Sequence, residues 1–282
     1  MNPHIASRRL IQLSSYVFLI LGLILILWPI VWTVSTSFKN TGALFAMPPQ
    51  WIPKEPTLQP YLQLFKPDNP FPIWFRNSVF VAVLTVLIGL ILAIFAGYAL
   101  SRYRFRGSNA LMLFILSSQM FPTVLLLIGI YVFFRDLHLL NNPASLVLAY
   151  LSFALPFSIW MMKGYLDTIP MEMEEAGLID GCSRLGVLFR ITLPLLAPAV
   201  ISVAVFNFLV AWSELMFALT LMTDDAVRTF PPGLIIRYAG QYQSLYNEMM
   251  AASVLVTIPV IIIFIFLQRY VVEGMTLGAV KG

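Results

Sequence analysis

The chain has 282 residues, of which 60% are hydrophobic and only 11% are charged, and its formal net charge is +4. An ordinary soluble domain carries about 25% charged residues. The composition therefore excludes a soluble enzyme, a disordered chain and a collagen-like chain. Apolar runs recur along the whole length, which also excludes a soluble protein with one membrane anchor. We expect a multi-spanning membrane protein, in which the positive charge orients cytoplasmic loops and is not a nucleic-acid signal.

Six apolar runs are long enough to cross a bilayer as helices, which takes roughly 20 residues. The runs are continuous and rich in Leu, Ile, Val and Phe, whereas a barrel would show short alternating strands. The sequence thus predicts an all-α membrane protein with six transmembrane helices, forming one domain over residues 1–282. The predicted spans are 12–36, 77–100, 110–134, 144–166, 197–221 and 250–271.

The first run follows Ser7-Arg8-Arg9, which looks like the start of a twin-arginine signal. The run is longer than a signal core and contains Trp28-Pro29, so we interpret it as a span with the arginines in the cytosol. The tight basic turn 101–106 agrees with this orientation. Both termini and the loop 167–196 are then cytosolic, while the proline-rich segment 37–76 and the segment 222–249 are outer loops.

The chemistry that a self-sufficient pump or enzyme needs is missing from the sequence. A P-loop ends in Gly-Lys-Ser/Thr, and the chain contains no Gly-Lys pair. No Gly-x-Ser-x-Gly or His-Glu-x-x-His motif occurs either. Cys182 is the only cysteine, and His4 and His138 lie far apart, so no cysteine or histidine metal site is expected. We predict no enzyme activity and no cofactor on this chain.

Three polar residues within the spans are candidates for a translocation path. Glu214 lies in the outer half of the fifth run, and such a charge faces a cavity or a partner unless it is hydrated at the interface. Asn207 lies two helical turns earlier on the same face, and the alternative role for this amide is a helix–helix contact. Gln119 pairs with Thr123 on the third run, where packing is the alternative and Pro122 favours a kink.

The loop 167–196 has the pattern of a short helix followed by a turn and a second short helix at 183–190. Pro170 suits the first helical turn, and Glu172 and Glu174 suit its positive N-terminal dipole. Ala176 and Gly177 are small, so another surface can approach closely, and the glycine at 181 permits a chain break or a left-handed turn. The pattern predicts an exposed acidic helix for docking a soluble partner, with an ordinary solvated loop helix as the alternative.

Glu175-Ala176-Gly177, the later Gly181 and Ile191-Thr192-Leu193-Pro194 together resemble the EAA loop of ABC-importer permeases. One fixed position differs, since Gly177 stands where the family has a second Ala. Three further segments resemble the carbohydrate-uptake, MalG-like branch of that family. They are the Pro-Gln-Trp-Ile-Pro stretch 49–53, the Ala-Trp-Ser-Glu stretch 211–214 and the tail 273–282.

The resemblance implies a type I ABC-importer permease fold in a bacterial cytoplasmic (inner) membrane and alternating access driven by a separate ATPase. The implied partners are a second, MalF-like permease, a dimer of P-loop ATPase subunits that bind ATP and Mg, an extracytoplasmic solute-binding protein, and membrane lipid. The implied cargo is a carbohydrate or a related polyol or glycoside. The residues implied in ATPase coupling are Glu174, Glu175, Ala176, Gly177, Asp180, Gly181 and Arg184. The tail residues implied to contact the ATPase are Gly278, Ala279, Lys281 and Gly282.

Two alternatives stay open at this point. The first keeps the importer class and changes the cargo to glycerol phosphate or another small osmolyte. The second is a self-sufficient secondary transporter or channel, against which the shortage of ionisable residues in the spans argues.

Overall fold

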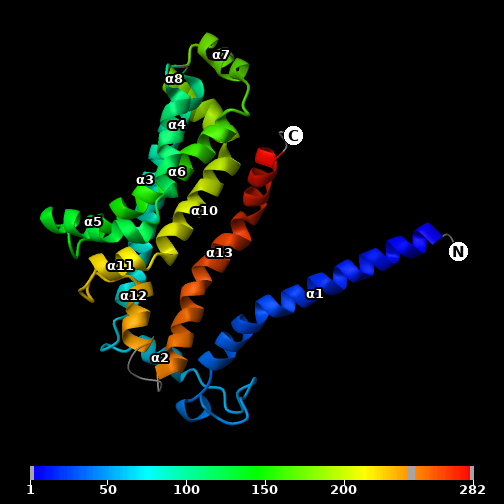
Figure 1. The fold of residues 1–282 in the computed structure, drawn as a ribbon, viewed down its shortest axis with the longest axis vertical. Coiled ribbons are helices and arrows are strands. Elements are labelled where there is room, and N and C mark those ends of the chain that lie inside the picture. The colour runs from blue at the N-terminus through cyan, green and yellow to red at the C-terminus, as the bar shows by residue number, and fades with distance from the viewer. Residues whose placement is uncertain (1–2, 104, 240–244, 280–282) are drawn as a thin grey trace. The chain divides into compact units, whose positions relative to one another are not determined.

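A computed structural model describes residues 3–103, 105–239 and 245–279. Figure 1 shows a helical chain, and the described residues contain no β-strand. The α-helices are α1 (Pro3–Ser37), α2 (Gln59–Leu64), α3 (Phe71–Arg102), α4 (Ser108–Ser117), α5 (Thr123–Asp136), α6 (Pro143–Leu166), α7 (Met171–Ile179), α8 (Arg184–Val187), α9 (Leu193–Leu195), α10 (Ala197–Ser213), α11 (Met216–Leu221), α12 (Phe230–Leu234) and α13 (Tyr246–Ala279). Short 3₁₀ and π segments are η1 (Thr41–Ala43), η2 (Ser118–Met120), η3 (Leu188–Thr192) and η4 (Ile235–Ala239). The all-α prediction is confirmed.

Four stretches of the described helices are long and apolar enough to cross a membrane, and two bent helix pairs raise the possible total to six. The four stretches are Gln12–Ser37, Phe71–Arg102, Pro143–Leu166 and Tyr246–Arg269. The bent pairs are Ser108–Met120 with Thr123–Asp136, at 96°, and Arg184–Leu195 with Ala197–Ser213, at 81°. The chain is therefore a multi-pass helical membrane protein.

The run 110–134 is two helices, α4 and α5, which are joined through η2 and bent by 96°. α4 passes into η2, and Phe121 then adopts an extended backbone with φ −80° and ψ 127°. Pro122 causes the break, because it lacks an N–H and disfavours helical geometry in the residue before it. The kink that Pro122 favours in the sequence is thus a complete break, with a 96° bend between the two helices.

The run 197–221 is also interrupted, and its two helices are α10 and α11. α10 ends at Ser213, and Glu214 is extended with φ −71° and ψ 130°. The Glu214 carboxylate accepts hydrogen bonds from the backbone N–H groups of Phe217 at 2.9 Å and Ala218 at 3.1 Å. These donors open α11 and have no partner within their own helix. Glu214 thus stabilises a new helix start in place of a continuous helix.

The chain forms two compact units, Met1–Asn69 with Arg237–Thr257 and Pro70–Ile236 with Ile258–Gly282. In the first unit the proline-rich segment contains only the short helices η1 and α2, as its composition predicts. Trp51 from this segment packs against Trp28 and Trp32 of α1, with ring centroids 4.3 and 4.7 Å apart. Lys39 is buried with its ammonium 3.9 Å from the Trp32 ring centroid, and burial lowers its pKa. One domain over the whole chain stays a prediction.

The second unit is built on the mutual packing of α3, α6 and α10. Small residues at Gly89, Ala93 and Gly97 recur every four positions on α3, a spacing that lets membrane helices approach closely. A Cβ added at Gly97 would lie 3.0 Å from the Cβ of Met162 on α6. The contact is therefore made by backbone against side chain, and the small-residue spacing that allows it is visible in the sequence.

Candidate functional site

The helix α7 projects from the second unit at one end of α3 and α6, and its start and end follow local sequence rules (Figure 1). Pro170 is the residue before the helix, one position earlier than predicted, and Glu172 and Glu174 lie in the first turn. At the other end Gly181 has φ +87°. Its N–H donates to the Leu178 carbonyl at 3.1 Å, which satisfies an open carbonyl of the helix end. Of the two roles that a glycine permits at position 181, the structure has the left-handed turn.

A second short helix follows at once, as the sequence predicts. Ser183 caps α8, because its Oγ accepts the N–H of Gly186 at 3.1 Å. The helical path continues through η3 and α9 and reaches α10 after the bend near Leu196. The loop 167–196 is therefore an ordered helix–turn–helix segment between α6 and α10.

One face of this segment is exposed and carries most of the residues singled out in the sequence. The exposed ones are Glu175, Ala176, Asp180, Gly181 and Arg184. Between them stand apolar side chains, above all Ile179, which is 86% exposed, and Leu185, which is 59% exposed. The exposed face of the segment thus carries both charged and apolar side chains.

The other face of α7 is buried, so the prediction of an exposed acidic helix is wrong for Glu174 and Gly177. Glu174 is 6% exposed. A Cβ at Gly177 would lie 2.3 Å from Cδ1 of Ile191 and 3.2 Å from Cγ2 of Val187. The surface that approaches Gly177 closely is thus the chain's own η3 segment with the end of α8.

The Glu174 carboxylate has three side-chain partners from two other elements. It forms a salt bridge with Arg102 Nε at 2.8 Å, and the side chains are 5% exposed for Arg102 and 8% for Glu174. The Tyr98 hydroxyl donates to Oε2 at 2.9 Å, and Thr192 Oγ1 donates to Oε1 at 3.2 Å. In the sequence Arg102 is only part of a basic turn, and its pairing with Glu174 has no local signal, since 72 positions separate them.

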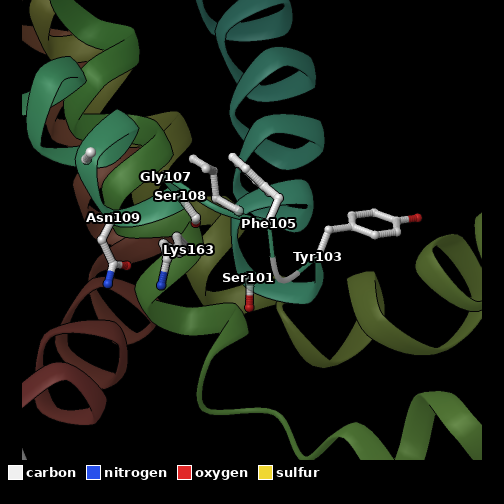
Figure 2. A pocket seen from close by; sticks show the side chains of 9 residues that line it. Ser101, Tyr103, Phe105, Gly107, Ser108, Asn109 and Lys163 are labelled. Atoms are coloured by element: carbon white, nitrogen blue, oxygen red, sulfur yellow. The ribbon is translucent and has the colours of Figure 1, made fainter.

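A polar pocket of about 320 Å³ adjoins this cluster, between the ends of α3, α4 and α6 (Figure 2). Its polar lining includes Ser101, Ser108, Asn109 and Lys163. Lys163 is paired with Asp167 at 2.6 Å, and Ser101 donates to the other oxygen of that carboxylate, also at 2.6 Å. The lysine charge in the pocket is therefore balanced within the chain.

The three candidates for the translocation path have separate partners. Asn207 is 0% exposed and accepts a hydrogen bond from Ser158 at 2.8 Å. A Cβ at Gly89 would lie 2.7 Å from its Nδ2, so Asn207 joins α3, α6 and α10, as the helix–helix alternative predicts. Gln119 donates to the carbonyl of Phe153 at 2.6 Å. Glu214 caps α11, so these contacts link each candidate to different elements.

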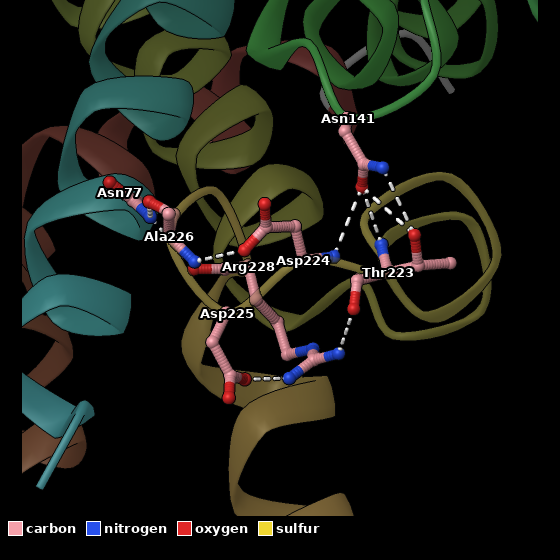
Figure 3. Close-up of polar contacts among 7 residues, drawn as sticks. All are labelled: Asn77, Asn141, Thr223, Asp224, Asp225, Ala226 and Arg228. Carbon is pink, nitrogen blue, oxygen red and sulfur yellow. Dashed lines mark hydrogen bonds and ion pairs between the residues drawn. The ribbon is translucent and has the colours of Figure 1, made fainter.

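The loop between α11 and α12 is held by two asparagines from distant elements (Figure 3). Asn141, which has φ +57°, accepts the N–H groups of Thr223 at 2.7 Å and Asp224 at 3.1 Å. Asn77 donates to the carbonyls of Ala226 and Arg228, both at 3.0 Å. Arg228 is buried and pairs with Asp225, and burial lowers the pKa of its guanidinium. The sequence did not indicate this ordered loop.

The predicted tail contacts fall at the end of the chain. Gly278 and Ala279 are the last residues of α13. Lys281 and Gly282 lie outside the described residues. A cluster of at least three metal-binding side chains does not occur in the part of the chain that the structure describes.

The structure is that of a multi-pass helical membrane protein in which an ordered segment of short helices, exposed on one face, connects α6 to α10. Residues 85–277 match the family model of the binding-protein-dependent transport system inner membrane component. The chain belongs to this family.

The similar proteins extend over nearly the whole chain. The trehalose/maltose transport system permease protein MalG of Thermococcus litoralis is 35% identical, with 100% of each chain covered. The diacetylchitobiose uptake system permease protein DasC of Streptomyces coelicolor is 35% identical, covering 94% of this chain and 95% of DasC. A crystal structure of a bacterial ABC transporter that imports alginate matches in fold, with a TM-score of 0.82, 23% identity, and coverage of 94% and 97%.

Proposed function

We propose that this chain is the permease subunit of an ATP-driven importer for a carbohydrate or a related polyol or glycoside. The sugars named for the permeases of Thermococcus litoralis and Streptomyces coelicolor support this cargo class. The observation that carries the importer role is the exposed face of α7 and α8, which the chain connects directly to the spanning helices α6 and α10. Solute crosses the membrane along a path shared with a second, MalF-like permease.

In this proposal α7 lies in the cytosol, with both termini, and docks in a cleft of a separate P-loop ATPase. Ile179 and Leu185 supply the apolar contact, and Glu175, Asp180 and Arg184 supply charges around it. ATP and Mg bind to the ATPase dimer, whose closure moves α7 and the attached spans. Because the segment 167–196 is ordered through Gly181 and Ser183, a push on α7 reaches α6 and α10 without being lost in a flexible loop.

The delivery of solute falls to an extracytoplasmic binding protein. The alginate system, whose structure includes a periplasmic protein with bound pentasaccharide, supports such a partner for this chain. The described intramembrane carboxylate at Glu214 is engaged in capping α11, which favours ATP-driven over ion-driven transport.

The test is co-purification of the tagged chain from its native membrane in mild detergent, followed by uptake in proteoliposomes with Glu175→Ala. We expect a P-loop ATPase and a second permease to accompany the chain. Glu175→Ala keeps these partners and loses solute uptake per ATP hydrolysed, whereas Glu172→Ala, an exposed glutamate in the first turn of the same helix, leaves uptake unchanged. A chain that purifies alone, or unchanged uptake in Glu175→Ala, contradicts the proposal.

A further inference from the structure

The last turn of α3 ends in Arg102, and each of its three guanidinium nitrogens donates a hydrogen bond. Arg102 Nε donates to Glu174 Oε1 at 2.8 Å, and Nη2 donates to the carbonyl of Ile169 at 3.2 Å. Nη1 donates to Ser101 Oγ at 3.3 Å. One side chain of α3 therefore binds both α7 and the segment that precedes it, with the directional geometry that a guanidinium allows.

Glu174 is equally committed on its side. Tyr98 of α3 and Thr192 of η3 donate to the same carboxylate, at 2.9 and 3.2 Å. With 5% and 8% side-chain exposure, both ions of the Arg102–Glu174 pair are largely shielded from solvent. A buried charge left without its partner is strongly destabilising, so each residue depends on the other.

The position of this pair within the fold gives it a mechanical meaning. The chain itself joins α7 to α6 on one side and, through α8, η3 and α9, to α10 on the other. α3 has no such covalent connection to α7. The Arg102–Glu174 salt bridge and the hydrogen bond from Tyr98 to Glu174 link α3 to α7 noncovalently.

The pair lies beside a buried apolar cluster, to which Tyr98 belongs. Tyr98, Met162, Leu166 and Leu188 belong to one buried apolar cluster that joins α3, α6 and η3. A second polar link runs beside it, from Ser101 to Asp167 and on to Lys163. The end of α3 is thus fastened to α6, α7 and η3 at once, which favours movement of these elements as one body.

We propose that Arg102 is a positioning residue for ATP coupling. Its pair with Glu174 stays closed through the transport cycle and makes α3 follow α7 when the ATPase moves that helix. This inference rests on the proposed function, since it takes α7 to be the element that the ATPase moves. A purely structural brace would support assembly and stability alone, without any effect on the ratio of transport to ATP hydrolysis.

The test compares variants in the assembled transporter in lipid, with its ATPase and solute-loaded binding protein. Arg102→Ala, and the milder Arg102→Lys, which keeps the charge and loses the fork, are measured for ATP hydrolysis and for solute transported per ATP. Truncation of one partner of a buried charge pair has large effects, so we expect Arg102→Ala to lower solute per ATP about tenfold or more, with hydrolysis retained. The matched control is Arg106→Ala, an exposed arginine of the same basic turn, which leaves the ratio unchanged. The reversed pair Arg102→Glu with Glu174→Arg restores part of the ratio.

A distance measurement with the Arg102–Glu174 pair intact keeps the proposal testable if the variants fail to assemble. Spin labels replace Tyr103, which follows Arg102 in the chain, and Glu172 on α7, in a Cys182→Ser background. The label distance is expected to be the same without nucleotide and in the state trapped with ATP and vanadate. A changed distance, or a normal solute-to-ATP ratio in Arg102→Ala, overturns the proposal. Failure of the ATPase to co-purify with the wild-type chain overturns the proposed function instead.

Discussion

Placing the family's alanine at position 177 is expected to bring none of the stability that alanine usually adds within a helix. In an isolated helix, Gly to Ala stabilises by about 1 kcal/mol, so the family pattern alone predicts a benefit. In the structure, a Cβ at this position would lie 2.3 Å from Cδ1 of Ile191, and 3.2 Å from Cγ2 of Val187. Non-bonded carbon atoms do not approach this closely, so the terminal methyl group of the Ile191 side chain must move.

The magnitudes decide the sign of the effect. Forcing an extra methyl group into a packed site costs about 1–3 kcal/mol, which outweighs or cancels the gain of about 1 kcal/mol in helix propensity. Ile191→Val removes the clashing Cδ1 and by itself costs about 0.5–1.5 kcal/mol. In the double variant the new Cβ fills the vacated space. The loss of stability in the double variant is therefore expected to be about 1 kcal/mol smaller than the sum of the losses in the two single variants, a coupling that is usual for residues in contact.

The assay is the thermal midpoint of the purified transporter in lipid nanodiscs for the wild type, the two single variants and the double variant. Gly164→Ala is the matched control, because Gly164 also lies within a helix and has no atom within 4 Å of an added Cβ. We expect Gly164→Ala to raise the midpoint and Gly177→Ala to leave it unchanged or lower it. If Gly177→Ala raises the midpoint as much as the control does, the packing argument is refuted.

Three further predictions follow from the contacts of the spans and the α11–α12 loop. Asn77→Leu removes both hydrogen bonds to the loop carbonyls and is expected to lower stability by about 1–3 kcal/mol, measured by thermal unfolding in lipid. Glu214→Ala loses the cap of α11 at a cost of about 0.5–2 kcal/mol in stability. Glu214→Gln keeps an accepting oxygen and is expected to keep most of the solute uptake. If Glu214→Gln loses as much uptake as Glu214→Ala does, the charge itself is required for transport. Gly97→Leu is expected to abolish assembly, judged by co-purification, because an added Cβ lies 3.0 Å from Met162, while Gly129→Leu, with open space around it, assembles normally.

Local patterns predict much of the fold correctly. Continuous apolar runs locate the spanning helices, because a bilayer requires long stretches without charge. The turn at Gly181 and the helix at 184–187 follow from rules that act over a few residues. The bends near Pro122 and Glu214 are harder to predict. A proline in a helix can produce either a kink or a break. A glutamate in an apolar run gives no sign that it will cap a new helix.

The sequence by itself determined the spanning helices, the spacing of the segment 167–196 and the absence of a P-loop, since each depends on residues that are neighbours along the chain. Only the tertiary structure decided which side chains of that segment face outward. Glu174 and Glu175 are adjacent and chemically identical, yet Glu174 is buried and its neighbour is exposed. The reason is a partner 72 positions away, Arg102, because the pairing of charges across a packed interior depends on how helices meet and not on local sequence.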